Sequence, residues 1–542
     1  MISGNRSNLW KIISWVTASL LVLPIIVMLM SGLSATTELF SHLWDTVLPT
    51  YIINTLYLAI IVGLLSTLFG VVSAAIITQT NVYAKNILRW LLMLPLAMPA
   101  YLVAYLYTDL FDYAGPVQRY LRGFFGWESP SDYWFFDIRT IFGAGVVISL
   151  VLFPYVYMLA RTAFELQDKN LHRASRLLGF NTFQTFYKVS LPLARPAIAI
   201  AVSLVLMETL ADFATVQYFA VNTLTTAVYD TWLGYGDLSA ANALASILML
   251  MVFFVVLFEQ KARMKQRHQS NRPTRGSQVI LLSTFKQILA SSFCWALVFL
   301  GFLLPFLLLI LMAYEYASLD QLEALISTGV NSLELSFYTA TLTTLIALIL
   351  VLYKRLHQDK LRGVPVNLAG FGYAIPGTVL AMAMLATFGP LDNFINELAL
   401  KVGIDEPGLI LSGTIFAIVF AFIVRFSAIA NGTLTSGVEQ ISQSIDLAPP
   451  SLGVGQFKSI LKVHIPMLKS SLFIAWLLVF VEAMKELPAV LLLRPFNFDT
   501  LSTQIYQLIS DERLEQGAIG AILIVAFGLI PIIWLNKNED KV

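Results

Sequence analysis

Cysteine and charge are scarce in this chain of 542 residues. Cys294 is the single cysteine, which excludes an intramolecular disulfide and a cysteine-ligated metal site. Only 12% of the residues are charged and the formal net charge is +1, so no basic domain indicates a nucleic-acid partner. The dipeptide Gly-Lys is absent. Because a phosphate-binding P-loop requires that dipeptide, we predict that this chain binds no nucleotide or other cofactor itself.

Histidine is also rare and shows no spacing typical of a metal site. We interpret all five as solvated residues in loops or at span ends: His42, His172, His268, His357 and His464. No catalytic constellation accompanies them. The sequence therefore predicts neither a metal site nor a catalytic residue.

Apolar residues are abundant, at 58% of the chain, and the mean hydropathy is +0.76. About 20 helical residues cross the hydrocarbon layer, so nearly uncharged windows of that length predict transmembrane helices. Twelve such windows lie at 12–37, 46–84, 90–108, 140–160, 196–221, 238–258, 287–313, 335–353, 363–391, 407–424, 470–493 and 516–536. The first could be read as a signal peptide, but its apolar run is too long, and we favour a retained helix. The predicted fold is an all-α integral membrane protein.

Lysine and arginine predict the orientation, because they concentrate in cytoplasmic loops. One set of alternate loops is basic and includes Lys85, Arg176 and Lys458, whereas the other set is mainly acidic and includes Glu38, Glu323 and Asp511. The loop 112–139 carries both signs. This pattern places both termini in the cytoplasm.

One polar segment occurs twice in this apolar chain, at 173–192 and at 447–466. Matching residues stand at a constant offset of 274: Ala174, Gly179, Lys188 and Pro192 correspond to Ala448, Gly453, Lys462 and Pro466. We expect the glycine to form a sharp bend with positive φ, and the proline to fix where the next span begins. Leu177, Leu178, Phe183 and Phe186 would offer an apolar face to a partner. A single copy would suggest only an amphipathic loop, but two copies favour a coupling role.

The repeat extends into the helices, because Asn54 and Pro99 match Asn331 and Pro376 at an offset of 277. We therefore predict two parallel halves of six spans, 1–258 with a coupling loop at 165–196 and 287–542 with a coupling loop at 431–470. The basic segment 259–286 between them is interpreted as a cytoplasmic linker, with binding to anionic lipid as the alternative. Pro95, Pro99 and Pro376 could expose carbonyls to a transport route, but simple kinks are favoured.

Four acidic residues lie within apolar windows: Glu208, Asp212, Glu482 and Glu486. Each pair is spaced i, i+4, so we expect both members on one helical face. Buried ionisable groups usually face a cavity or a partner. The sequence predicts a polar pathway for a cationic or hydrated substrate, and the alternative is a set of hydrogen bonds or an ion pair with Lys485.

The repeated segment resembles the pattern E-A-A-x3-G-x9-I-x-L-P, which is the ATPase-coupling loop of ABC-transporter permeases. The resemblance implies the fold of a type I ABC importer permease. It also implies that each loop docks on homodimeric ATPase subunits, which would carry the ATP and magnesium. The pattern's glutamate is Arg173 in one copy and Leu447 in the other, so its usual polar contact is missing. Asp446 is a candidate replacement.

Stretches 211–245 and 484–514 look like bacterial inner-membrane permeases for iron(III). That resemblance implies a periplasmic substrate-binding protein as a further partner and leaves thiamine or phosphonate as alternative cargoes. A proton-coupled secondary transporter with two six-helix repeats would explain the buried acids but not the repeated loop. A receptor or scaffold would explain neither feature.

Overall fold

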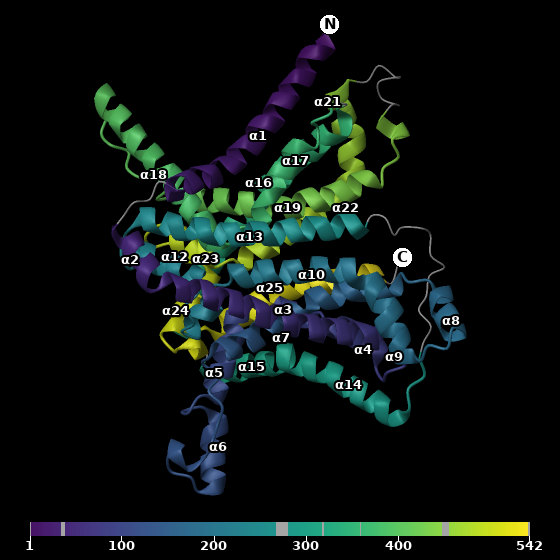
Figure 1. Ribbon diagram of the computed structural model, residues 1–542. Helices are drawn as coiled ribbons and strands as arrows, with labels where there is room; N and C mark the ends of the chain where they lie inside the picture. The colour runs from purple at the N-terminus through teal and green to yellow at the C-terminus, as the bar shows by residue number, and fades with distance from the viewer. Residues whose placement is uncertain are drawn as a thin grey trace. The chain divides into compact units, whose positions relative to one another are not determined.

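The computed structural model describes residues 2–33, 38–266, 280–316, 319–357, 359–446 and 455–539 (Figure 1). These residues form helices joined by turns and loops, and one isolated parallel bridge links Thr80 with Ile280. Within them, 11 helices are long and apolar enough to cross a membrane, or up to 12 if one bent pair, Lys85–Ala97 with Ala100–Phe125, counts as a single span. The predicted all-α membrane fold is confirmed.

The helices gather into two compact units. Unit 1 comprises Met1–Ser41, Val228–Ile247 and Leu322–Gln504. Its helices are α1 (Ile2–Leu33), most of α16 (Leu319–Leu356), α17 (Val364–Ala369), η6 (Gly370–Ala374), α18 (Gly377–Val402), α19 (Ile415–Glu439), α21 (Gln456–Ser459), η7 (Ile460–His464), α22 (Ile465–Lys485) and α23 (Pro488–Leu493).

Unit 2 comprises His42–Ala227, Leu248–Gln321 and Ile505–Val542. Its helices are most of α2 (Glu38–Thr46), α3 (Leu48–Gln79), α4 (Lys85–Leu91), η1 (Leu94–Ala97), α5 (Ala100–Phe111), α6 (Pro116–Phe125), η2 (Pro130–Asp132), α7 (Ile141–Glu165), α8 (Lys169–Leu177), α9 (Thr182–Thr185), η3 (Phe186–Ser190), α10 (Leu191–Ala211), α11 (Ala214–Tyr218), α14 (Thr284–Val298), η5 (Phe299–Leu303), α15 (Leu304–Tyr316), η8 (Leu514–Gly517) and α25 (Ala518–Glu539). Besides α2 and α16, three of the described helices are divided between the units: α12 (Leu224–Leu233), α13 (Leu238–Gln266) and α24 (Leu501–Ser510).

Each compact unit includes the first span of the sequence half that supplies most of the other unit. In unit 1, α1 packs against α17 and α18, and in unit 2, α14 and α15 pack against α3, α4, α5 and α25. The predicted halves 1–258 and 287–542 describe the sequence repeat, and the compact units follow a different division. Helix α13 also continues beyond residue 258 to Gln266, and α14 begins at Thr284.

Small residues permit the most extensive helix pairing in unit 2, where α3 and α7 lie side by side (Figure 1). A Cβ at Gly70 would lie 2.5 Å from Cβ of Val156, and one at Gly145 would lie 2.5 Å from Cγ2 of Ile61. Because lipid tails are as apolar as the side chains, close van der Waals packing of this kind holds membrane helices together.

The prolines matched at offset 277 mark complete helix breaks. Pro99 and Pro376 stand directly before α5 and α18, and the preceding residues Met98 and Ile375 are extended, with ψ of 123° and 125°. In the first half, the helices on the two sides of the break are bent by 91°. The interpretation as simple kinks is therefore wrong, because the extended residue ends the helix before the proline.

The linker is described only at its ends, and residues 267–279 lie outside the described ranges. Residues 259–266 continue α13 as helix. At the other end, the backbone N–H of Ile280 donates to the Gln79 carbonyl at 2.8 Å, and that of Leu282 donates to Oδ1 of Asn81 at 2.8 Å. These contacts attach the start of α14 to the loop that follows α3.

Candidate functional sites at the coupling segments and the helix breaks

The first coupling segment, 168–192, is built around a bend at Gly179. Its φ is +82°, as the sequence predicted, and an added Cβ would meet nothing within 4 Å. The N–H of Gly179 donates to the Arg176 carbonyl at 3.0 Å, and that of Phe180 donates to the Ser175 carbonyl at 3.1 Å. These two bonds form a Schellman motif that ends α8.

Polar side chains fix the helices on both sides of this bend. Asp168 caps the first turn of α8 by accepting from the N–H of Asn170. Asn181 forms a reciprocal capping box with Gln184 at the start of α9. The buried hydroxyls of Ser175 and Thr185 lie 3.0 Å apart and join the two helices. Ser175 occupies the second alanine position of the coupling pattern, so this departure has a structural role.

The segment presents an apolar surface, but with one fewer residue than the sequence predicted. Leu177, Leu178 and Phe183 are 89%, 75% and 75% exposed. Phe186 instead packs inward against Phe164, with ring centroids 5.8 Å apart. Lys188 is exposed and lies 5.0 Å from the centroid of the Phe180 ring. Ala174 is also exposed.

Both prolines that were expected to begin a span lie inside a continuous helix. The span in the first half runs from Thr182 to Ala211, so it begins before Pro192. A π-helical turn precedes each proline, η3 in the first half and η7 in the second, at the same offset of 274. Proline lacks an N–H and disrupts the regular bonding pattern, and the wider turn accommodates it. The proline thus marks a π-turn, and the expectation that it starts the span is wrong.

The second coupling segment is described only in part, because Ala448 and Gly453 lie outside the described residues. Lys462 and Pro466 are exposed, like most of the first segment. Asp446, the candidate replacement for the missing glutamate, instead faces inward. One of its oxygens lies 2.5 Å from Nε of Arg355, and the other lies 3.0 Å from Nε2 of His464.

Two histidines correct the view that all of them are solvated. His464 is buried in the π-turn η7, between Asp446 and the Ser459 carbonyl. His357 is buried as well, and its ring stands 4.6 Å from the ring of Tyr353. Loop position alone did not reveal this burial, because the end of α16 packs against the coupling region only in the folded chain.

The fifth helix of each half ends at an acidic residue. Helix α10 ends at Ala211, and Asp212 is extended with a ψ of 126°. Its carboxylate accepts the N–H and the hydroxyl of Thr215, at 3.0 and 2.8 Å, and so caps α11. The expectation that Glu208 and Asp212 share one continuous helical face is therefore wrong, because Asp212 lies beyond the helix end.

Glu486 occupies the same position in the second half but has a different partner. Helix α22 ends at Lys485, and Glu486 has a ψ of 129°. Its Oε1 accepts from the Ala489 N–H at 3.3 Å and lies 3.4 Å from Nη1 of Arg425, a pair that is almost fully buried. A Cβ at Gly377 would lie 2.5 Å from the same oxygen, so glycine is required where α18 begins. The positive end of that helix further stabilises the carboxylate.

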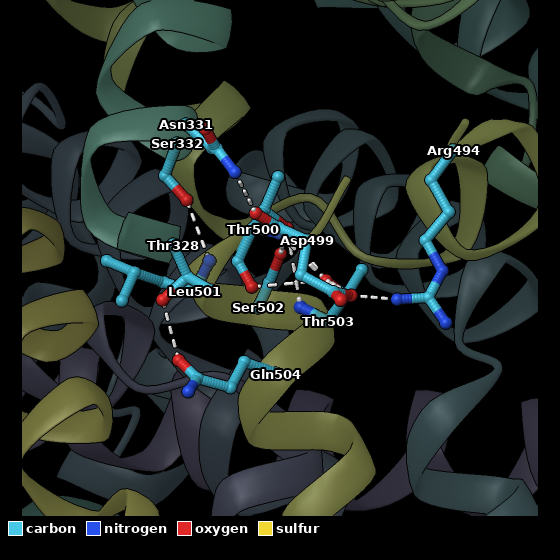
Figure 2. A network of polar contacts seen from close by, with 10 residues as sticks. All are labelled: Thr328, Asn331, Ser332, Arg494, Asp499, Thr500, Leu501, Ser502, Thr503 and Gln504. Carbon is cyan, nitrogen blue, oxygen red and sulfur yellow. Dashed lines mark hydrogen bonds and ion pairs between the residues drawn. The ribbon is translucent and has the colours of Figure 1, made fainter. Parts of the chain in front are cut away.

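A polar network holds the segment after the break in the second half (Figure 2). Ser332 accepts the N–H of Leu501 at 2.7 Å, and the amide of Asn331 donates to the Asp499 carbonyl at 2.9 Å. The Ser502 hydroxyl donates to the Glu486 carbonyl at 2.8 Å. Further contacts connect Thr328 with Gln504, Arg494 with Asp499, and Thr500 with Thr503. The network attaches the break to α16.

The first half repeats this network with the corresponding residues. Asn54 donates to the Asn222 carbonyl at 3.0 Å, and Thr55 accepts the N–H of Leu224 at 3.0 Å. The Thr225 hydroxyl donates to the Asp212 carbonyl at 2.8 Å. The sequence repeat identified Asn54 and Asn331 as matching residues, but it did not reveal the carbonyl groups to which they donate hydrogen bonds. The recurring Asn-Thr-Leu-Thr-Thr and Asp-Thr-Leu-Ser-Thr stretches were the available signal for this part of the site.

Glu208 and Glu482 lie inside their helices and remain partly exposed. Nζ of Lys485 lies 3.6 Å from Oε1 of Glu482, which is the local ion pair that the sequence offered as an alternative. The structure therefore separates the four acids by environment. Asp212 and Glu486 stabilise the helix breaks, whereas Glu208 and Glu482 precede the breaks by one helical turn.

The 11 or 12 candidate spans of the described residues, together with the coupling segment, are typical of a multi-pass membrane permease, which is a transport subunit rather than an enzyme. Residues 66–267 match the family described as "Binding-protein-dependent transport system inner membrane component". That similarity implies a binding protein and an ATPase as partners.

Relatives cover most of the chain. It is 26% identical over 493 residues to the Fe(3+)-transport system permease protein FbpB 2 of Haemophilus influenzae, covering 90% of each protein. It is 25% identical to the ferric transport system permease protein FbpB of Actinobacillus pleuropneumoniae, covering 89% of this chain and 69% of the relative. A putative molybdenum transport permease of Bacillus subtilis is 25% identical but covers only 40% of this chain.

Proposed function

We propose that this chain is the membrane subunit of an ATP-driven importer that moves iron(III) from a periplasmic binding protein into the cytoplasm. The observation that supports iron(III) as the cargo is the similarity over 90% of the chain to a permease named for Fe(3+) transport. The putative molybdenum permease is similar over only 40% of this chain, so this similarity supports the general class of importer permeases but not molybdenum as the cargo.

The energy would come from a homodimeric ATPase that binds ATP and magnesium and docks on the two coupling segments. The exposed Leu177, Leu178 and Phe183 suit an apolar groove on such a subunit, and Lys188 adds a charge beside them. Residues Ala174, Pro192, Lys462 and Pro466 lie in the same segments, together with Ala448 and Gly453. Docking on the basic side of the membrane requires both termini to be cytoplasmic.

Glu208 and Glu482 would contribute to the transport pathway, and Asp212 and Glu486 would maintain the breaks that shape it. Ionisable groups within membrane spans are costly and usually line a polar route. A ferric ion would be held strongly by carboxylates in a low-dielectric site, so we expect brief contact during passage rather than storage.

The test is uptake by proteoliposomes that contain this chain, its ATPase and a binding protein loaded with radiolabelled ferric iron. Binding proteins loaded with molybdate or sulfate are the cargo controls. We expect ferric-loaded protein alone to stimulate both ATP hydrolysis and uptake. Stimulation by a molybdate-loaded protein in its place would contradict the proposed cargo.

Glu208→Gln combined with Glu482→Gln tests the pathway in the same vesicles. The amides keep the side-chain size and remove the charge. We expect uptake to fall by about tenfold, which corresponds to about 1.4 kcal/mol, with normal amounts of assembled complex. Unchanged uptake would refute the pathway role, and loss of the complex would indicate a structural role instead.

A further inference from the structure

Helix α6 has two chemically different sides. It begins with Pro116, directly after Gly115, and it ends at Gly126, whose φ is +72°. At 100° per residue, one arc contains only apolar residues: Val117, Tyr120, Leu121, Phe124 and Phe125. The opposite arc contains Gln118, Arg119, Arg122 and Gly123. This division is typical of a helix that lies between an apolar and an aqueous phase.

The apolar side is left uncovered by the described residues around it. Tyr120, Phe124 and Phe125 are 73%, 69% and 56% exposed. A series of stacked rings continues from Phe125 through Trp127 to Tyr133, with centroids 4.6 Å apart at each step. An aromatic surface of this size needs a partner that is apolar in part.

The polar side is fixed to the protein. Nη1 of Arg122 donates to the Tyr113 carbonyl at 2.8 Å, and its guanidinium lies 4.1 Å from the centroid of the Tyr113 ring. The amide of Gln118 donates to the Phe111 carbonyl at 2.8 Å. These bonds orient α6 with respect to α5, so the direction of the apolar side is set by the fold.

The position of α6 identifies the apolar phase. Residues 112–115 separate it from α5, and the segment Ala100–Phe125, which contains both helices, is bent by 91° from Lys85–Ala97. The next candidate span, α7, begins at Ile141. In Figure 1, α6 runs across the direction of α3 and α7, which cross the membrane. A helix so oriented at the end of a span lies along the membrane surface. The coupling segment follows α7, so α6 is at the opposite face of the bilayer.

We propose that α6 is an interfacial helix whose aromatic side enters the lipid leaflet opposite the coupling segment. Tyr and Trp are the residues enriched at this depth. Arg119 is exposed on the other arc, where it can reach lipid phosphate while the rings enter the acyl region. In the alternative arrangement, the rings would lie outside the bilayer and would be covered by a docked binding protein.

The second half has a corresponding feature, which argues against an accident of one loop. The last turns of α18 expose Phe394, Leu398 and Val402 at a spacing of four residues. This helix ends at Gly403 with a φ of +81°, at the same offset of 277 from Gly126 that relates the prolines. Both halves therefore have an amphipathic helical end at the matching position of the sequence repeat.

The experiment uses the full chain with Cys294→Ala and one new cysteine labelled with a polarity-sensitive fluorophore. The test position is Phe124→Cys, and the matched control is Gly123→Cys, the adjacent residue on the polar arc, where an added Cβ meets nothing within 4 Å. Tyr120→Cys is a second test position. The protein is placed in vesicles of phosphatidylethanolamine and phosphatidylglycerol that contain a lipid with a nitroxide near the headgroup end of its acyl chain.

We expect the nitroxide lipid to quench the label at 124 and at 120 several-fold more than at 123. A water-soluble, impermeant quencher should give the reverse order. Equal quenching at 123 and 124 by both reagents would overturn the proposal. So would a label at 124 that is accessible to the soluble quencher until a binding protein is added, because that result identifies a protein partner. Neither readout depends on cargo, so failure here is distinguishable from failure of the proposed transport function.

Discussion

Gly179→Val is expected to uncouple ATP hydrolysis from transport. The residue has a φ of +82°, and an added Cβ meets nothing within 4 Å, so the substitution introduces backbone strain without a steric clash. A β-branched residue in the left-handed region costs about 1 to 3 kcal/mol. A cost near 2 kcal/mol lowers the ratio of bent to unbent segment about 30-fold.

The assay is the number of cargo ions taken up per ATP hydrolysed in proteoliposomes. Gly236→Val is the matched control, because Gly236 has a φ of +70° and equally open surroundings but lies between α12 and α13, outside the coupling segment. Gly179→Asn is a rescue variant, since asparagine tolerates positive φ better than valine. We expect loss of coupling in Gly179→Val, partial recovery in Gly179→Asn and normal coupling in Gly236→Val.

Normal coupling in Gly179→Val would refute the role of the bend. Equal losses in Gly179→Val and Gly236→Val would refute the reasoning in another way, because strain anywhere in the chain would then be sufficient. The same change at Gly453 tests whether the second copy of the segment acts alike.

Two further predictions concern the buried pair and the orientation. Arg425→Met leaves Glu486 as an unpaired buried charge and should destabilise the protein by about 3 to 5 kcal/mol, measured by thermal unfolding in detergent. Adding Glu486→Gln should restore part of that loss, whereas strictly additive losses would show that the two groups do not interact. In a Cys294→Ala background, a cysteine at Ser131 should react with impermeant maleimide in intact spheroplasts and one at Ser444 only after lysis. The opposite pattern would reverse the predicted orientation.

The sequence alone determined the membrane class, the approximate positions of the spans and the repeat, because each of these depends on local composition or on residue spacing. The predicted window 196–221 nevertheless begins 14 residues after the start of its span, Thr182–Ala211. The windows predicted from missing charge all overlap helices of the structure. The positive φ of Gly179 was also predictable, since a glycine that separates two short helices usually supplies it. No residue spacing indicated a cargo, and the proposed iron(III) cargo rests on resemblance to permeases named for ferric transport.

Only the tertiary structure decided how the acids and prolines act. Asp212 and Glu486 looked like members of a helical face, and they became helix-end residues because Thr215 and Arg425 offer partners that periodicity does not reveal. Pro192 looked like a helix start, but the π-turn before it lets the helix continue. The packing of α1 in unit 1, and of α14 and α15 in unit 2, likewise depends on contacts between distant segments. Sequence patterns report only on neighbours along the chain.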